Sequence, residues 1–501
     1  MSFVTGILLI VCSVLIGRAL LPDRKQLRRS LWEELGIAYL LGTGFTVVVI
    51  TAGFFAGLKL GVLWWIPLLA GIASFVLNRR RQDSLGELQA APWNRPIGIA
   101  LAVMAIGSFL ATLALPLNEF DPLYHFAYRG KVLLYDGTPL SEAITGMIHP
   151  DGYGRMVTHP NYPFGIPILE AWVSKFGGWN DRWVQLPLAL WAACLPMAIA
   201  CGLRSYSNQA ASTGAVLAAA TPMLYTSNFP VDGWSNLSLA GLGGETIIGG
   251  GADLAVATMF ATACALLLAA YRSNDRRTAL CAALALAGAV MMKNEGLALA
   301  GVLLLATFLG MIVPPRRTKV LLPFAGIAIV GILPWVGLRA QLPAIDENYS
   351  DQMTVENVLH YLGGGRELVE KSPEAVSKRA EIDFDAAPAR IGLVWEAFLE
   401  EFLNWRSWGI LWLLAIVSLP FTKPRLLSAE HRWLTLLVLG GITLYFLILL
   451  VTPWNFPNLR TKGIPERLLI HLVGPILLLF GTASALGQSK KVPAGPGAAQ
   501  S

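Results

Sequence analysis

Carboxylates and bases follow directly after one of the uncharged runs of this sequence. The run 97–117 carries no charged residue, and Glu119, Asp121, His125 and Arg129 come next. A carboxylate that can take a proton and that lies near cationic groups is suited to general acid–base catalysis. The same residues also occur in ordinary solvated loops. Two interpretations therefore stay open: a wet loop, or a reaction centre at the edge of a membrane.

A second polar cluster contains His149, His159 and Tyr162. Both histidines precede prolines, and one interpretation is that they only stabilise turns. They can also be read as metal ligands, although two histidines ten residues apart in a loop are a weak metal pattern. The spacing alone does not choose between these interpretations.

Three further motifs place isolated charges next to apolar runs. Asp253 follows the glycine-rich stretch 241–251, Lys293 and Glu295 lie in "MMKNEG", and Arg467 lies in "IPERLLIHLVGP". The glycines have no phosphate-loop spacing, so a flexible connector is the alternative for them. Lys293 and Glu295 can simply pair with each other, and Arg467 can be an interfacial anchor.

The elements that must position these residues are predicted to be membrane-spanning helices. Of the 501 residues, 55% are hydrophobic and 14% are charged, whereas soluble domains have about 25% charged residues. Uncharged runs of about 20 residues, long enough to cross a bilayer, recur along the chain. The fold class is therefore an all-α polytopic membrane protein with about 13 transmembrane helices. The expected spans are 3–22, 34–57, 59–78, 97–117, 182–203, 210–227, 252–271, 277–292, 295–313, 319–338, 406–421, 432–452 and 468–487.

The basic residues gather in short connectors between these runs, as in the cytoplasmic loops of membrane proteins. The positive-inside rule then places the loops 118–181 and 339–405 outside. This predicts a multi-pass protein of the inner (plasma) membrane whose polar clusters face the periplasm or exterior. The net charge of +6 lies in those short loops, so nucleic acid is not an expected partner.

Two apolar segments are predicted not to span. Counting crossings between outer and inner loops leaves none for 163–177, so this segment should lie as a juxtamembrane helix at the outer interface, with Glu170 and Lys175 in water. The segment 389–405 reads in the same way, with apolar residues at helical spacing opposite Arg390 and several glutamates.

The chain is expected to have three parts: an N-terminal three-helix membrane segment (1–96), a catalytic membrane module (97–487), and a disordered cytoplasmic tail (488–501) rich in Pro, Gly and Ala. Few ionisable residues lie within the spans, and the five cysteines all lie in apolar runs. The expected chemistry therefore concentrates at the outer interface.

Taken in order over 97–480, these segments resemble those of bacterial GT-C glycosyltransferases. The first outer loop of that family is similar to "NEFDPLYHFAYRGKVLLYDGTPL", and its His-Pro-x-Tyr-Pro segment to "HPNYPFGIPILEAWVSKFGGWNDR". Its Ala-Asp-Leu-Pro-Leu helix start resembles "GADLAVATMFATACALLL", with Ala255 where Pro is common. Its Lys-x-Glu-Gly hairpin and late Asp-Arg-Leu-Leu element resemble "MMKNEGLALA" and "ERLLIHLVGP".

The resemblance implies an inverting transferase that uses a polyprenyl-phosphate-linked sugar, similar to protein mannosyltransferases and the aminoarabinose transferases of lipid A. Its partners would be that lipid donor, membrane lipid, and an acceptor hydroxyl on a glycan, lipid or protein. Asp121 would be the general base, with Glu119 as the second candidate. Lys293 and Arg467, then Arg129, would hold the donor phosphate.

Further donor contacts are expected from the remaining polar residues. Asp253 and Glu295 would orient the donor sugar or Lys293, and the other substrate-binding candidates are His149, His159 and Tyr162. No cofactor is demanded by the spacing. If a divalent cation takes part, Asp121, Glu119 and Asp253 offer oxygen ligands suited to Mg²⁺ or Mn²⁺.

Three other functions remain alternatives. A transporter or flippase of lipid-linked sugars would share the outer polar surface, but would need a polar path that the uncharged spans do not offer. A non-catalytic envelope-assembly scaffold would use the loops to bind a partner. A polysaccharide polymerase or ligase would need paired arginines in a large outer loop, and those of 339–405 are scattered.

Overall fold

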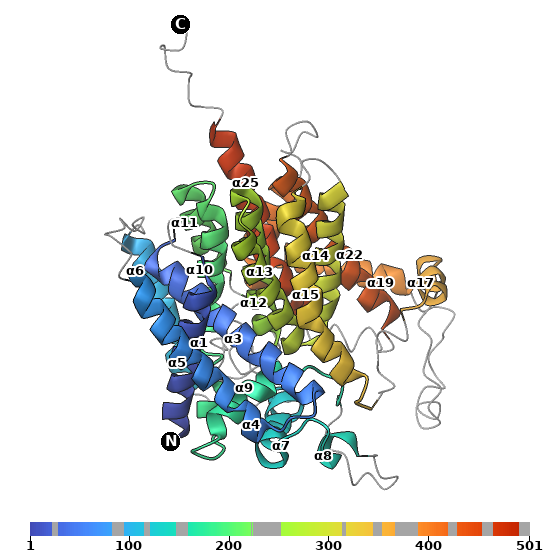
Figure 1. Ribbon diagram of the computed structural model, residues 1–501. Helices are drawn as coiled ribbons and strands as arrows, with labels where there is room; N and C mark the ends of the chain where they lie inside the picture. Colours follow the sequence, from blue (N-terminus) through green and yellow to red (C-terminus); the bar gives the residue numbers. More distant parts are fainter. Residues whose placement is uncertain are drawn as a thin grey trace, which may run out of the picture.

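A computed structural model shows a bundle of helices (Figure 1). It describes residues 1–22, 29–82, 95–114, 121–146, 159–221, 223, 252–312, 317–343, 353–365, 389–418, 428–452 and 464–489. Within these ranges every regular element is helical and no strand occurs, which confirms the all-α class. The longer helices are α1 (Ser2–Leu20), α3 (Leu31–Phe55), α5 (Trp65–Gln82), α6 (Arg95–Ala114), α10 (Trp191–Arg204), α11 (Asn208–Ala219), α12 (Ala252–Ser273), α13 (Arg276–Met292), α14 (Asn294–Ile312), α15 (Thr318–Arg339), α19 (Arg390–Leu403), α22 (Ala429–Val451) and α25 (Val473–Ser489). The shorter ones are α4 (Leu60–Leu63), η1 (Asp121–Ala127), α7 (Tyr128–Asp136), α8 (Glu142–Thr145), α9 (Gly165–Ser174), η2 (Trp183–Gln185), α17 (Val355–Leu362), α20 (Trp405–Trp408), α21 (Leu411–Ser418), α24 (Ile464–Leu469) and η5 (Ile470–Leu472).

Eight helical segments within the described ranges are long and apolar enough to cross a membrane. They are Ser2–Leu20, Leu31–Phe55, Leu60–Asn78, Ala252–Ser273, Asn294–Ile312, Thr318–Arg339, Ala429–Val451 and Ile464–Ser484. The other expected spans coincide with shorter or less apolar helices: α6, α10, α11, α13 and α21. The chain is therefore a polytopic membrane protein, and the count of thirteen spans stays a prediction.

Helix α12 lies at the centre of the bundle. Its spanning window is 94% buried, whereas those of α14 and α15 are each 33% buried and leave large apolar side chains exposed. Small residues allow this close packing, because they let helix backbones approach. A Cβ atom on Gly202 of α10 would lie 2.9 Å from Ala265, and one on Gly474 of α25 would overlap with Ala261. The outer faces of α14 and α15 are left for lipid.

The first three spans are packed into the same bundle. Helices α1 and α3 cross so closely that a Cβ atom on Gly17 would overlap with the Ala38 carbonyl oxygen. Helix α3 also contacts α10, α13 and α15. At one end of α3, Glu33 forms a fully buried ion pair with Arg204 of α10. The segment before residue 97 is thus held by both packing and charge.

Helix α9 lies at the opposite end of the bundle, close to α4 and α7 (Figure 1). The rings of Trp64 and Trp172 stack with centroids 4.8 Å apart. Each indole N–H donates to the other residue's carbonyl oxygen, at 3.2 and 3.0 Å. Two buried tryptophans thereby satisfy their only polar groups and join the turn before α5 to α9.

The prediction that Glu170 is in water is wrong, although Lys175 is exposed as expected. All ten residues of α9 are buried, and Glu170 is 1% exposed. Helix α7 covers this face, because Gly130 has no side chain and leaves room for the carboxylate. Burial raises the pKa of Glu170 well above its usual value, with the charge of Asp181 adding to the effect. These surroundings therefore favour the neutral form of the carboxyl group over the charged form.

The predicted helix over 389–405 is confirmed by α19, which lies beside the bundle with α17 (Figure 1). Arg390, placed on the wet face by the sequence pattern, is instead 1% exposed. Its guanidinium donates to the carbonyl oxygens of Leu449, at 3.2 Å, and Thr452, at 2.7 Å. Those carbonyls belong to the end of α22, where a helix lacks its own donors and attracts a cation.

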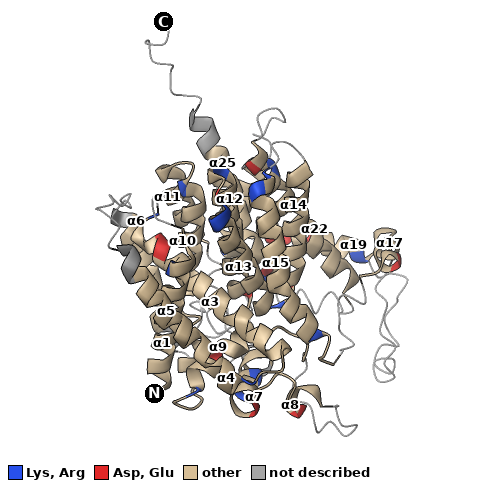
Figure 2. Cartoon of the chain, viewed as in Figure 1, with Lys and Arg blue, Asp and Glu red and all other residues tan. Residues whose placement is uncertain are grey.

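The charged side chains are mostly gathered near the two ends of the long helices, which are tan over most of their length in Figure 2. Glu33, Arg204 and Arg432 belong to the end where α10 stops and α3 and α22 begin. Asp253 and Lys293 belong to the opposite end, where α12 begins and α13 stops. The second end carries the predicted site residues.

Candidate functional site

A tight reversal of the chain carries Lys293 into the bundle. Helix α13 stops at Met292, Lys293 is extended with φ −158° and ψ 157°, and α14 starts at Asn294. The Gly296 N–H donates to the Lys293 carbonyl at 3.0 Å. A Cβ atom on Gly296 would overlap with the Ala289 carbonyl oxygen, so the turn requires glycine there.

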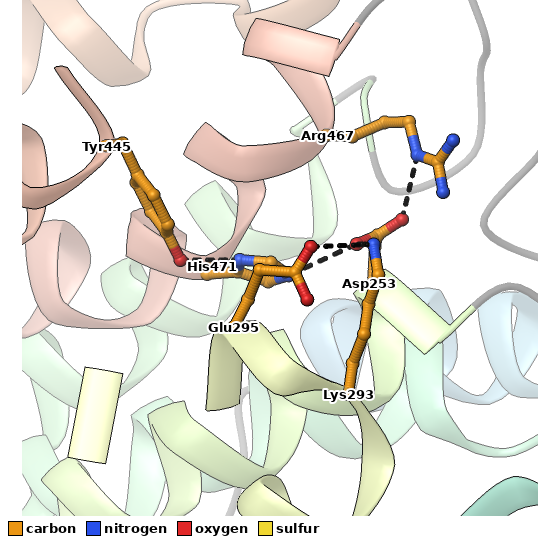
Figure 3. A network of polar contacts seen from close by, with 6 residues as sticks. All are labelled: Asp253, Lys293, Glu295, Tyr445, Arg467 and His471. Atoms are coloured by element: carbon orange, nitrogen blue, oxygen red, sulfur yellow. Dashed lines mark hydrogen bonds and ion pairs between the residues drawn. The ribbon is translucent and has the colours of Figure 1, made fainter. Parts of the chain in front are cut away.

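Two cations converge on one carboxylate at this end (Figure 3). Asp253 lies in the first turn of α12, where the helix N-terminus favours an anion. Lys293 Nζ donates to Asp253 Oδ1 at 2.8 Å, and Arg467 Nε donates to Asp253 Oδ2 at 2.9 Å. Lys293 Nζ also lies 3.1 Å from Glu295 Oε1. Four predicted site residues from three separate motifs are thus brought together.

A histidine and a tyrosine extend the cluster beyond the Asp253 carboxylate (Figure 3). His471 Nε2 lies 3.4 Å from Asp253 Oδ1, and His471 Nδ1 is 2.6 Å from the Tyr445 hydroxyl. Both His471 and Tyr445 are fully buried. The contact with Tyr445 fixes the orientation of the imidazole ring, as neighbouring hydrogen bonds do in many histidine sites.

The cluster is buried and balanced in charge. Asp253 is 3% exposed and Lys293 6% exposed, and the carboxylates of Asp253 and Glu295 offset the cations of Lys293 and Arg467. Removing a partner from a buried ion pair costs roughly 3–5 kcal/mol. An incoming anion would therefore gain two pre-oriented donors, but only by competing with Asp253 and Glu295. Such a site can hold a phosphate oxygen while the carboxylates turn to other polar groups.

Glu466, the residue before Arg467, forms a pair of carboxyl groups with Glu401 of α19. Trp408 Nε1 donates to Glu401 Oε2 at 3.0 Å. Ser407 Oγ and Asn404 Nδ2 each lie 3.4 Å from Glu466 Oε1. Burial, with the charge of Glu466 adding to it, raises the pKa of Glu401 to about 8. Glu401 is then a protonated acid at neutral pH, close to the cation cluster.

Arg129 lies apart from the cation cluster in its contacts. Its guanidinium donates to the carbonyls of Pro163, at 3.3 Å, and Tyr162, and lies 3.8 Å above the Phe164 ring. Burial lowers its pKa to about 9. In this structure Arg129 binds the turn that leads into α9, while its predicted contact with a donor phosphate stays a prediction.

The predicted residues His159 and Tyr162 form an aromatic cluster with His125. The ring centroids of His125 and His159 are 4.5 Å apart at an interplanar angle of 87°. The rings of His159 and Tyr162 are 4.8 Å apart. This cluster contacts the chain around Arg129, so it belongs to the outer-loop part of the structure.

Of the predicted base Asp121 and its alternative Glu119, the structure describes only part. Asp121 begins η1, of which the backbone is described, while Glu119 and His149 lie outside the described residues. The described parts of the chain contain no group of three His, Cys, Asp or Glu side chains that could hold a metal. In this arrangement both oxygens of Asp253 accept from cations. Metal binding by Asp121, Glu119 and Asp253 stays a prediction.

Sequence reasoning left His471 and Tyr445 out of the site. His471 follows Arg467 by four residues, a spacing that places two helical side chains on one face, so this signal was present. Tyr445 lies in an uncharged run and carries no such signal. Glu401 and Glu466 were also missed, because the proximity of two carboxyl groups from separate segments appears only once the chain is folded.

No family model matches the sequence, and no curated protein matches it. Among solved structures, an archaeal oligosaccharyltransferase, AglB from Archaeoglobus fulgidus in complex with an inhibitory peptide and a dolichol-phosphate, matches 80% of this chain at 12% identity and a TM-score of 0.45. The apo crystal structure of an Archaeoglobus fulgidus oligosaccharyltransferase matches 79% at 13% identity and a TM-score of 0.43. The chain spans about half of either structure, 51% in both cases. With likenesses this distant, the function must be argued from the residues of the site.

Proposed function

We propose that this protein is a membrane glycosyltransferase of the GT-C kind, which moves a sugar from a polyprenyl-phosphate-linked donor to an acceptor hydroxyl at the outer membrane interface. The observation that carries this proposal is the convergence of Lys293 and Arg467 on Asp253. These groups lie at one end of a bundle whose spans are almost free of charge.

The depth of the cluster suits a lipid-linked donor. A polyprenyl chain buries many methylene groups, at about 0.8 kcal/mol each, so the donor stays in the bilayer with its phosphate at the interface. The cluster lies at the first turns of α12 and α14, where spanning helices end. A cation at that level meets the phosphate without moving the lipid out of the membrane.

The proposed step is an in-line displacement at the anomeric carbon. The acceptor oxygen forms a bond to that carbon while the bond to the phosphate oxygen breaks, and the acceptor proton passes to Asp121. The leaving lipid phosphate gains one negative charge, which Lys293 and Arg467 stabilise. Glu119 is the second candidate for the base, and proton transfer of this kind contributes roughly 10²–10⁴ in rate.

The other residues are assigned to donor binding. Asp253 and Glu295 orient Lys293 in the free protein, and contact the sugar hydroxyls once the phosphate has taken the cations. Arg129, His159 and Tyr162 act from the outer-loop side, with His149 as a further candidate. A divalent cation, if required, would use Asp121, Glu119 and Asp253.

The test is transfer from a panel of polyprenyl-phosphate hexoses and pentoses by the purified, full-length protein. Arg467→Lys and Lys293→Arg keep the charge but change its placement, so they should weaken donor use while the protein stays folded. Asp121→Asn should lower the rate at saturating donor by roughly 10²-fold or more. Lys175→Ala, an exposed residue of the same side, is the matched control.

The result against the proposal is equally concrete. If no donor of the panel gives a product, or if Arg467→Lys and Lys175→Ala have the same dependence on donor concentration, the transferase assignment fails. Movement of an intact lipid-linked sugar across vesicles, without transfer, would assign a flippase instead.

A further inference from the structure

An apolar cavity lies at the end of the bundle opposite the cation cluster. Its volume is about 190 Å³, and its walls are almost entirely apolar side chains of α12, α14, α15 and α22, such as Leu267, Leu309, Leu321 and Leu436. From Asp253 to Tyr271, which also lines it, α12 rises by about 27 Å at 1.5 Å per residue. The cavity is thus separate from the cation cluster.

This cavity opens on the lipid-facing side of the bundle. Leu309 and Leu436 line it and are 38% and 47% exposed. They stand near other exposed apolar residues of α14 and α15, two spans that are each only 33% buried. An apolar cavity of about 150 Å³ already takes a benzene molecule. The size therefore fits a segment of hydrocarbon chain and excludes a hydrated head group.

The rim of the cavity is polar and carries more positive than negative charge. Tyr271, Glu430, Arg432 and Trp433 belong to its lining. Arg317 lies with its Cζ 5.6 Å from the Tyr271 ring centroid, and both arginines act electrostatically on that tyrosine, as does Glu430. Two arginines therefore face one carboxylate at the mouth.

Two buried donors at this rim lack acceptors. Trp433 Nε1 and Arg317 Nε have no hydrogen-bond partner among the described residues. A buried donor without a partner is costly, so a ligand that supplies acceptors there gains binding energy. The chemistry that would satisfy an indole N–H and a guanidinium together is a phosphate with its several oxygen acceptors.

We propose that this groove binds an anionic glycerophospholipid, with one acyl chain in the apolar cavity and the phosphate against Arg317 and Arg432. The apolar lining accounts for binding of the acyl chain. The two arginines, together with the unpartnered donors Trp433 Nε1 and Arg317 Nε, account for binding of the phosphate. Lys319, in the first turn of α15, adds further positive charge at this end. The site would tie the bundle to the leaflet opposite the proposed reaction centre.

The test is native mass spectrometry of the delipidated, full-length protein with dioleoyl phosphatidylglycerol and dioleoyl phosphatidylcholine, which share their acyl chains. The wild type should retain one phosphatidylglycerol in preference to phosphatidylcholine. Arg317→Gln and Arg432→Gln should each weaken that retention about fivefold. Arg276→Gln removes an exposed arginine of the same end and should have no effect.

Binding of the acyl chain is tested by filling the apolar cavity with a larger side chain. Gly310 lines it, with its nearest neighbour for a Cβ atom at 3.5 Å, so Gly310→Leu should occupy the cavity and remove bound lipid. Gly301→Leu makes the same change in open space on the same helix and should retain it. Arg317→Lys, which keeps the charge, should retain more lipid than Arg317→Gln.

Two results would overturn the proposal. The first is equal retention of both lipids by the wild type, which would make the groove a neutral hydrocarbon site. The second is unchanged retention of phosphatidylglycerol when Gly310→Leu is present and thermal unfolding shows that the variant is folded. Neither result bears on the transferase proposal, because the groove and the cation cluster lie at opposite ends.

Discussion

Replacing Asp253 by asparagine tests the electrostatics of the cation cluster directly. The substitution keeps the size of the side chain but removes its charge. Lys293, at 2.8 Å, and Arg467, at 2.9 Å, would then remain as buried cations with Glu295 as the nearest carboxylate. Two positive charges would then face each other across a largely buried site.

The magnitude follows from burial. Asp253 is 3% exposed and Lys293 6% exposed, so neither is well screened by solvent. Removing one partner of a buried pair costs roughly 3–5 kcal/mol, because the remaining charge loses its compensation. Glu295 is more exposed, at 17% of its side chain, so Glu295→Gln should cost less. For a protein of 501 residues the loss at Asp253 corresponds to a drop of roughly 3–5 °C in melting temperature.

The assay is thermal unfolding with and without farnesyl phosphate, a short polyprenyl phosphate. In Asp253→Asn the phosphate no longer competes with a carboxylate for the cations, so it should stabilise this variant more than the wild type. Farnesol has the same tail without the phosphate and is the ligand control. Asp136→Asn, an exposed carboxylate on α7, is the variant control.

The reasoning would be refuted by either of two results. One is an Asp253→Asn variant as stable as Asp136→Asn, which would mean that the cluster gains nothing from its central carboxylate. The other is equal stabilisation of wild type and variant by farnesyl phosphate and farnesol, which would mean that the cations do not bind phosphate.

Three further predictions concern the neighbouring groups. Because the pKa of Glu401 is raised to about 8, the folded protein holds a proton that the unfolded chain releases, so stability should fall as pH rises from about 4.5 to about 8; Glu401→Gln should flatten that decline in pH-dependent melting curves. Arg129→Met leaves the carbonyls around Tyr162 without their buried donor and should cost about 3 kcal/mol by thermal unfolding, and Lys, which lacks the guanidinium fork, should not restore it. Gly296→Ala forces a Cβ atom onto a carbonyl oxygen and should cost roughly 1–3 kcal/mol, whereas Gly301→Ala, in open space on the same helix, should be neutral or slightly stabilising in the same measurement.

The membrane-spanning architecture could be predicted from the sequence because it depends on local properties. Uncharged runs located α1, α3, α12, α14 and α22 to within a few residues. The isolated charges at the ends of such runs also identified Asp253 and Lys293 as candidates, because a charged group close to hydrocarbon is costly and usually has a function.

The partners of those charges could not be predicted in the same way. Whether a carboxylate lies in water or under another helix depends on packing between segments distant in sequence. Glu170 became buried because Gly130 of α7 made room for it, and Arg390 became buried because the end of α22 offered carbonyls. Helical periodicity describes one face of one helix and contains no information about the helix that will cover it.

The buried pair of Glu33 and Arg204 has a consequence for how the protein is made. The two residues are 171 positions apart, and both side chains are almost completely hidden. At about 5–20 residues per second, the ribosome needs roughly 10–30 s to deliver the arginine after the glutamate. During that interval Glu33 lacks this partner, so the ion pair that joins α3 to α10 can form only after the later helix has been made.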